Sequence, residues 1–91
     1  MTVTIADIEF DRVDYDANAD VLYLHVGDPS RAVDYDETPE GHAARFNRNG
    51  ELVGLTLVRP KLLFERHGAL HVTIPVPTAV PAAELAPILR Q

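Results

Sequence analysis

The amino-acid sequence predicts an α+β fold: a small, mostly antiparallel β-sheet of about five or six short strands joined by hairpins, followed by a short C-terminal helix. Three observations predict it. Short runs of β-branched, aromatic and aliphatic residues are separated by clusters of Gly, Pro, Asn and Asp. One pair of runs flanks a clear hairpin turn. The C-terminal segment spaces its apolar residues as a helix does.

The first strand is expected over residues 8–15, where β-forming residues mix with charged ones, after a loosely held lead-in at residues 1–7. Residues 16–20 have the composition of a turn, because Asp and Asn side chains accept hydrogen bonds from nearby backbone amides. Residues 21–26 are apolar apart from His25, which indicates a central strand covered on both faces.

A turn at residues 27–30 ends that strand, and residues 32–36 are expected to form another short one. Residues 42–46 and 52–58 then flank the sequence Asn-Arg-Asn-Gly, with Asn at the first turn position and Gly where a left-handed residue is needed. This pattern predicts a hairpin with a type I turn and a glycine bulge.

Residues 61–67 have two interpretations. They form a short helix if Pro60 begins it and Gly68 ends it, or a strand if the chain turns at positions 67–68. Three adjacent apolar residues at 62–64 break the alternation of a strand, so the helix is favoured.

A further strand is expected at residues 70–74, ended by Pro75 and Pro77. Residues 78–91 are the predicted C-terminal helical segment. Because Pro87 interrupts helical hydrogen bonding, this helix is expected to be short, bent, or to begin near Glu84.

All 91 residues are expected to form one domain, since a chain of this length supports one modest core. A small sheet with this much apolar content exposes an edge or a face, which a second copy covers most simply, so a homodimer is predicted. The predicted core consists of Val21, Leu22, Leu24, Val26, Phe46, Leu52, Val53, Leu55, Leu57, Leu63, Leu70, Val72 and Ile74.

Composition excludes several classes of protein. The chain has no cysteine, so it has no disulfide, thiolate nucleophile or thiolate metal site. A net charge of −6 argues against nucleic-acid binding. No apolar run approaches the roughly 20 residues that span a bilayer, and the first residues lack a secretory signal, so a cytoplasmic protein without membrane contact is expected. The charge is uneven: residues 1–51 hold 12 acids and 4 bases, which suits a basic partner.

Residues 16–20 imitate the opening of a calcium loop, with oxygen-bearing side chains at alternate positions. The rest of that loop fails, because Val21 stands where Gly is needed and Gly27 where a bidentate Glu is needed. We therefore interpret Asp16 and Asp20 as caps of backbone amides.

An acidic segment supplies the candidate site residues, which are Asp34, Asp36, Glu37, Glu40 and His42. Carboxylates beside a histidine suit either the binding of a basic partner or acid–base chemistry. The other histidines, His25, His67 and His71, could converge with these acids on a divalent metal, but no spacing motif selects one. Neither a serine nucleophile elbow nor a Gly-rich phosphate loop is present.

Two motifs resemble a known family. Tyr15-Asp16, then Ala19-Asp20-Val21-Leu22-Tyr23-Leu24, and after the acidic segment Asn49-Gly50-Glu51-Leu52-Val53-Gly54-Leu55-Thr56-Leu57, resemble the bacterial domain-of-unknown-function family 2283 (DUF2283) over about residues 13–58. Thr56 stands where family members often carry Glu. The resemblance implies a small antiparallel β domain without an assigned activity or catalytic residues, and an antitoxin-like or partner-binding role.

Two classes of function follow. The first is a non-enzymatic protein-interaction module that binds a small basic protein through an acidic face. The second is a small ligand- or divalent-metal-binding protein, or a minor enzyme, that uses His42 with Glu37 and Glu40. The first is favoured because nucleophile, metal-binding and phosphate-loop motifs are missing, and no cofactor or catalytic residue is expected.

Overall fold

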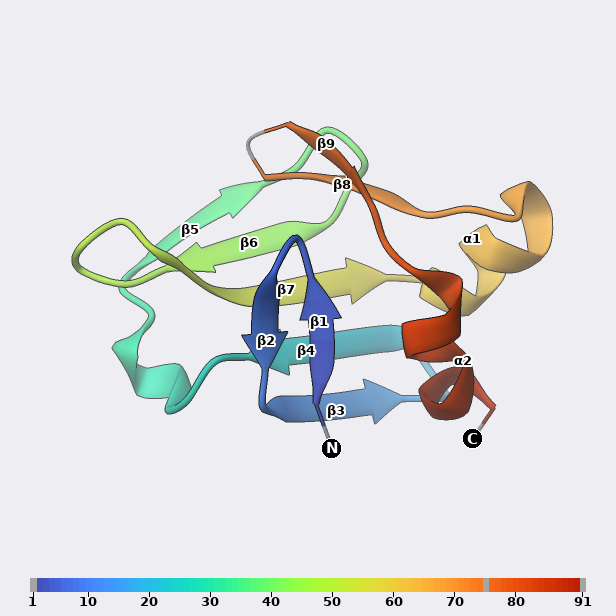
Figure 1. Cartoon of the computed structure of the whole chain (residues 1–91), viewed down its shortest axis with the longest axis horizontal. Coiled ribbons are helices and arrows are strands. Elements are labelled where there is room, and N and C mark those ends of the chain that lie inside the picture. Colours follow the sequence, from blue (N-terminus) through green and yellow to red (C-terminus); the bar gives the residue numbers. More distant parts are fainter. Residues whose placement is uncertain (1, 75, 91) are drawn as a thin grey trace.

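The strands expected along the middle of the chain assemble into a five-stranded antiparallel sheet, in a computed structural model that describes residues 2–74 and 76–90 (Figure 1). The predicted α+β fold is confirmed. The strand order is β3-β4-β7-β6-β5, so β7 lies at the centre and β3 and β5 form the edges. The strands are β3 (Arg12–Asp16), β4 (Val21–His25), β5 (Asp34–Glu37), β6 (Ala43–Phe46) and β7 (Leu52–Val58).

The centre of the sheet is held by two cross-strand leucine pairs. Leu22 of β4 lies opposite Leu57 of β7, and Leu24 lies opposite Leu55. All four side chains are buried on the same face, and burial of each stabilises the fold by about 1.5–3 kcal/mol. Tyr23 between them is 45% exposed, so the expectation that β4 is covered on both faces is wrong for the single chain.

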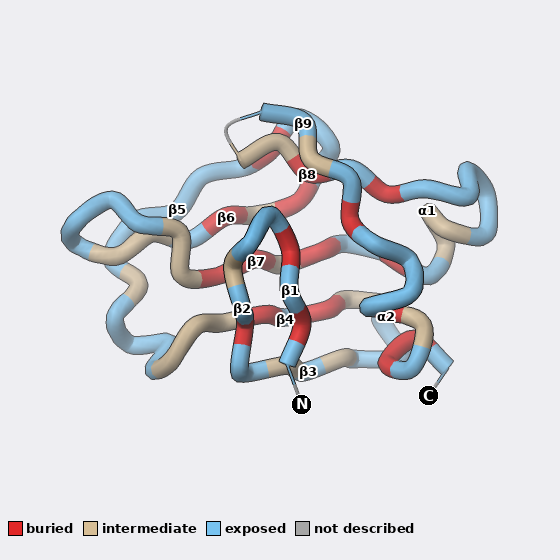
Figure 2. Tube along the Cα trace, in the orientation of Figure 1, coloured by how far each residue is buried: buried red, intermediate tan, exposed pale blue. Residues whose placement is uncertain are grey.

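One face of the sheet is covered by residues 3–10, 71–79 and 82–89, which we call the covering layer (Figures 1 and 2). It includes a hairpin that was not predicted from the sequence. Strands β1 (Val3–Ile5) and β2 (Ile8–Phe10) pair through a tight turn at Ala6 and Asp7, both with positive φ. Val3, Ile5 and Phe10 are fully buried. The prediction of a loose lead-in at residues 1–7 is therefore wrong, because an Ala-Asp turn gives no strong hairpin signal.

The single strand predicted over residues 8–15 is in fact two strands, β2 and β3, which belong to different sheets. The chain changes direction at Asp11, whose Oδ1 accepts a hydrogen bond of 2.8 Å from the Gly27 amide. This bond joins the corner to the end of β4. After it lies a short 3-10 helix, η1 (Pro29–Arg31), where the sequence predicted a turn.

The predicted hairpin is confirmed in its turn and in its bulge. Asn47 Oδ1 accepts hydrogen bonds from the amides of Asn49 and Glu51, and Gly50 has a φ of +79°. The Asn47 amide donates to the Glu51 carbonyl and the Gly50 amide to the Asn47 carbonyl, which places the bulge at Gly50. A separate irregularity lies further along the strands, where the pairing of β6 with β7 shifts register between Arg45 and Phe46. Local side-chain chemistry therefore sets how β6 and β7 begin to pair.

Residues 61–67 are helical, as the apolar run predicted. Helix α1 (Pro60–His67) begins at the proline and ends at Gly68, which has a φ of +68° and donates its amide proton to the Phe64 carbonyl. The strand predicted at residues 70–74 is confirmed as β8 (His71–Thr73). It pairs with β9 (Pro77–Ala79), which was not predicted because prolines flank it.

The C-terminal helix α2 (Ala82–Leu89) packs over the sheet beside β1 (Figure 1). It is short and begins before Glu84, with Pro87 inside it, so the Ala83 carbonyl lacks the usual N–H partner at position 87. Core residues that the sequence reading missed are Val3, Ile5, Phe10, Ala44, Val80, Leu85, Ile88 and Leu89.

Three positions named in these expectations, namely Met1 in the lead-in, Pro75 at a strand end and Gln91 in the helical segment, lie outside the described residues. Across the described part, neither helix is long and apolar enough to cross a membrane.

Replacement of Phe10 by Ala tests the contribution of the N-terminal hairpin. Phe10 is fully buried, so we expect Phe10→Ala to lower the free energy of unfolding by about 3–5 kcal/mol. Urea denaturation followed by circular dichroism measures this loss. Thr4→Ala, at an exposed position of the same hairpin, is the matched control and should stay within about 0.5 kcal/mol of the parent chain. An equally small effect at Phe10 would contradict the buried hairpin.

Candidate functional site

The acids of the turn between β3 and β4 are occupied by structural hydrogen bonds. Asp16 Oδ1 accepts from the amides of Asn18 and Ala19 at 3.1 and 3.2 Å. Asp20 has a positive φ of 54°, which Asp tolerates better than most residues. The prediction that both aspartates cap backbone amides is confirmed: Asp16 caps amides of its own turn, and Asp20 caps amides elsewhere in the chain.

Asp20 caps a helix that begins about forty residues later in the sequence. Its two carboxylate oxygens accept from the amides of Lys61 and Leu62 at 3.2 and 3.1 Å, and its carbonyl accepts from Arg59 at 2.7 Å. The Tyr15 hydroxyl donates to Asp20 Oδ1 at 2.7 Å. Burial, together with this bond, raises the pKa of Tyr15 to about 12.

Glu40 also has a structural role. Its carboxylate accepts from the amide of Thr73 at 3.0 Å and from the hydroxyl of Thr73 at 2.6 Å. These bonds from Thr73 lower the pKa of Glu40 to about 2. The side chain thereby ties the turn before β6 to strand β8, which leaves it poorly placed to bind a partner.

His42 is 1% exposed and lies directly before the first residue of β6. Its Nδ1 accepts a hydrogen bond of 3.0 Å from the Val58 amide, so the proton of the neutral ring lies on Nε2. No described group bonds to Nε2. Burial lowers the pKa of His42, which keeps the ring neutral. Neither nitrogen then has a free lone pair for a metal ion.

The histidines give little support to a metal site. Glu40, His42, His67 and His71 line one shallow depression beside α1. Within the described residues, however, no group of three or more His, Asp or Glu side chains is placed to hold a metal ion. Glu37, Glu40 and His42, which the second functional hypothesis combined, therefore do not form such a group.

The acids of β5 divide between the two faces of the sheet. Asp34 and Asp36 pair with Phe46 and Ala44, so they lie on the face that carries the core. Tyr35 and Glu37 lie on the opposite face, and the Tyr35 hydroxyl donates to the Glu37 carboxylate at 3.4 Å. The five predicted site residues therefore do not form one surface: Glu40 is bonded to Thr73, and His42 is buried.

A groove of about 420 Å³ lies beside Asp36, between the sheet and the β8–β9 hairpin. We call it the β5 groove. Half-buried Phe46, Leu52 and Ile74 supply an apolar lining, while Asp36 and Thr73 supply polar groups. From the sequence we expected these three apolar residues to be part of the buried core. The sequence does not show how much of the sheet the β8–β9 hairpin covers, so their partial exposure could not be predicted.

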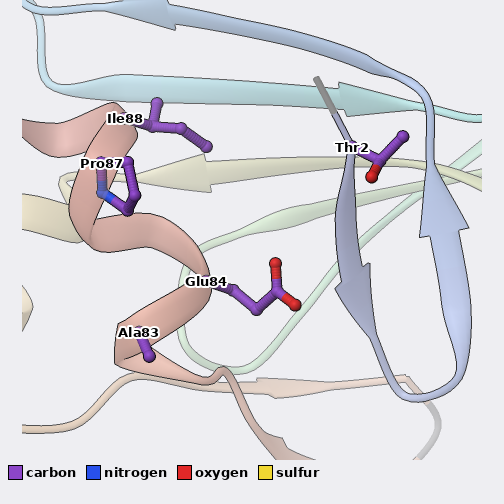
Figure 3. Close-up of a pocket in the computed structure, with 5 residues that line it drawn as sticks. All are labelled: Thr2, Ala83, Glu84, Pro87 and Ile88. Atoms are coloured by element: carbon purple, nitrogen blue, oxygen red, sulfur yellow. The ribbon is translucent and has the colours of Figure 1, made fainter.

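A second groove, of about 350 Å³, lies between α2 and β1 (Figure 3). The close-up shows Glu84 extending from the helix into this space, with Thr2 across it on the first hairpin. Ala83, Pro87 and Ile88 complete the lining. The polar groups of this groove are the Glu84 carboxylate and the Thr2 hydroxyl. Among the described residues, the lining has no base, no second metal ligand and no second charge, so this groove has no evident chemistry.

The main sheet is the part of the chain that matches a known protein family. A family model described as "Protein of unknown function (DUF2283)" matches residues 12–59, which is more than half of the chain. The chain belongs to the DUF2283 family. The match runs from β3 to the residue after β7, so it contains all five strands of the main sheet. Comparisons with curated proteins and with solved structures gave no match.

Membership of DUF2283 confirms the resemblance drawn from the Tyr15–Leu24 and Asn49–Leu57 motifs. The family description assigns no activity. The first of these motifs is now explained by structure, because Tyr15 and Asp20 bond to each other and Asp20 caps α1.

The Asp20 cap leads to a stability prediction. We expect Asp20→Ala to lower the free energy of unfolding by about 1–2 kcal/mol, because the first amides of α1 and the Tyr15 hydroxyl lose their acceptor. Asp20→Asn keeps one acceptor oxygen and tolerates the positive φ, so it should lose less. Chemical denaturation of both variants measures the difference. An unchanged stability in Asp20→Ala would contradict the capping role of the carboxylate.

The buried histidine leads to a pH prediction. Because the folded chain lowers the pKa of His42 below 6.5, the unfolded chain binds more protons as the pH falls below that value. The free energy of unfolding should therefore drop, by on the order of 1 kcal/mol, between about pH 7 and about pH 5. The pKa of His25 is also lowered, mainly by burial, and contributes in the same direction.

Denaturation at several pH values measures this drop. In His42→Asn the amide oxygen takes the place of Nδ1, so it can accept from Val58 but does not titrate, and the drop should be smaller. His67→Asn, at an exposed position, is the control and should keep the parent profile. A profile unchanged in His42→Asn would contradict the assignment.

Proposed function

We propose that the chain is a cytoplasmic, non-enzymatic protein-interaction module that binds a basic, extended segment of a partner protein along β5 and the β5 groove. The observation that carries this proposal is the position of an acidic strand at the edge of the sheet, beside an apolar groove. A small basic protein, of the kind that an antitoxin neutralises, fits this surface.

The edge position supplies backbone hydrogen-bonding groups. Within the sheet β5 pairs with β6 alone, and all four of its residues are exposed. An edge strand presents amide and carbonyl groups that an added strand can pair with. Recognition by strand addition takes its affinity from the main chain and its specificity from pockets for alternate side chains.

The charge of β5 selects the partner. Three of its four side chains are carboxylates, and one base, Arg45, lies directly across on β6. An added strand rich in Lys or Arg gains from these acids, whereas an acidic strand is repelled. The same acids oppose edge-to-edge pairing of two copies of this chain.

The β5 groove supplies a place for an apolar side chain. Phe46, Leu52 and Ile74 are half-buried there, so a side chain that entered would remove further apolar surface from water. Asp36 stands at this groove and would meet a neighbouring base of the partner. The surface therefore favours a partner strand that carries basic and apolar residues on one face, at every second position of its sequence.

A short synthetic peptide whose every second residue is Lys or Phe, in turn, with Thr between them, tests this surface directly, because its Lys and Phe side chains lie on one face of the strand. Its binding is measured by fluorescence anisotropy, and its location by amide chemical shifts. We expect shifts in β5, in β6 and around Ile74, with binding that weakens as salt is raised. Asp34→Lys combined with Asp36→Lys should weaken binding about tenfold or more.

The matched control is Glu9→Lys combined with Glu84→Lys, which makes the same change in net charge at exposed positions away from β5. It should bind the peptide nearly as well as the parent chain does. Equal weakening by both double variants would mean that net charge alone attracts the peptide. An absence of shifts in β5 would also overturn the proposal.

A further inference from the structure

The face of the main sheet opposite the covering layer carries no element of this chain in the described residues (Figures 1 and 2). We call it the open face. The strand registers arrange its side chains in rows across the strands. One row contains Arg12, His25, Gly54, Arg45 and Tyr35, the next contains Asp14, Tyr23, Thr56, Ala43 and Glu37, and a third contains Asp16, Val21 and Val58.

The open face carries several exposed apolar side chains. Tyr23, Tyr35 and Val58 are 45%, 62% and 37% exposed, and they account for three of the five large hydrophobic side chains that the described residues expose. The His25 ring lies over Gly54, where an added Cβ would come within 2.8 Å of the ring Cε1 atom. A side chain larger than hydrogen at position 54 would therefore push the histidine outward.

The charges of the open face lie in a simple order. Arg12 and Arg45 occupy the first row, whereas Asp14 and Glu37 occupy the next. Adding Asp16 gives two bases against three acids, so this face is nearly balanced although the whole chain carries a net charge of −6. A strongly basic or strongly acidic partner would leave one row opposed by like charge.

We propose that the open face binds a second copy of the chain, sheet against sheet, with the strands of the two copies running in reversed directions. A two-fold axis between the first two rows places each arginine row over the acidic row of the other copy. Arg12 then faces Asp14 of the second copy directly, and Arg45 faces Ala43 of the second copy, one strand away from its Glu37. Tyr23, Thr56 and Ala43 pack against the matching strands at the centre, as in a β-sandwich.

This surface is distinct from the β5 groove, because Asp34 and Asp36 lie on the other face of β5. The homodimer that the sequence predicted is thereby given an interface. The same stacking would cover the second face of β4, which the apolar run at residues 21–26 led us to expect.

Charge reversal across the two-fold axis tests the inference. In Arg12→Asp the new carboxylate faces Asp14 of the other copy, and in Asp14→Arg the new guanidinium faces Arg12. Each variant alone should weaken the dimer about tenfold. A mixture of the two variants restores both pairs and should form a heterodimer. Analytical ultracentrifugation measures each association, and circular dichroism confirms that each variant folds.

Tyr23→Glu places a charge at the centre of the interface and should give monomers. Arg48→Glu, a charge reversal on an exposed turn away from the face, is the control and should leave the dimer intact. A parent chain that stays at 10.0 kDa at about 100 μM would overturn the inference. So would a dimer that resists Tyr23→Glu, or a mixture that does not associate. Neither result would affect binding of the Lys-Phe peptide, so the two proposals fail separately.

Discussion

The carboxylate of Asp20 is the point at which the two halves of the chain are joined. It lies in the turn that leads into β4, yet it caps the first amides of α1 and accepts the Tyr15 hydroxyl. Helix α1 leads to the β8–β9 hairpin and then to α2, which together cover much of the sheet. The cap therefore helps to set where the covering layer begins, and so indirectly where the β5 groove is left open.

Features that rest on local chemistry could be predicted from the sequence. The Asn47–Gly50 turn holds its own amides through the Asn47 side chain, and Pro60 and Gly68 begin and end α1 as their backbone preferences indicate. The aspartates of the β3–β4 turn were identified as caps for the same reason. The distant helix that Asp20 caps could not be inferred, because nothing near Asp20 in the sequence indicates it.

Features that depend on distant segments could not be predicted. The first hairpin turns at Ala6 and Asp7, which both have positive φ. Neither is a glycine, so the sequence gives no sign of this turn, and the buried residues around it looked like a loose lead-in. Glu40 and His42 looked like site residues because their hydrogen-bond donors, the amides of Thr73 and Val58, lie far along the chain. Once the bounds of β5 are known, the alternation of side chains along a strand does predict that its acids are divided between the two faces of the sheet.

The acidic edge of the sheet also limits how large an assembly of this chain can become. Growth of a continuous sheet would bring β5 or β3 of one copy against an edge of another, and both edges carry carboxylates. Such growth is therefore opposed, which protects the chain against fibrous aggregation. A copy has one open face, so stacking through it is complete after two copies. Assembly by that route is finite, and a concentrated solution would contain discrete particles.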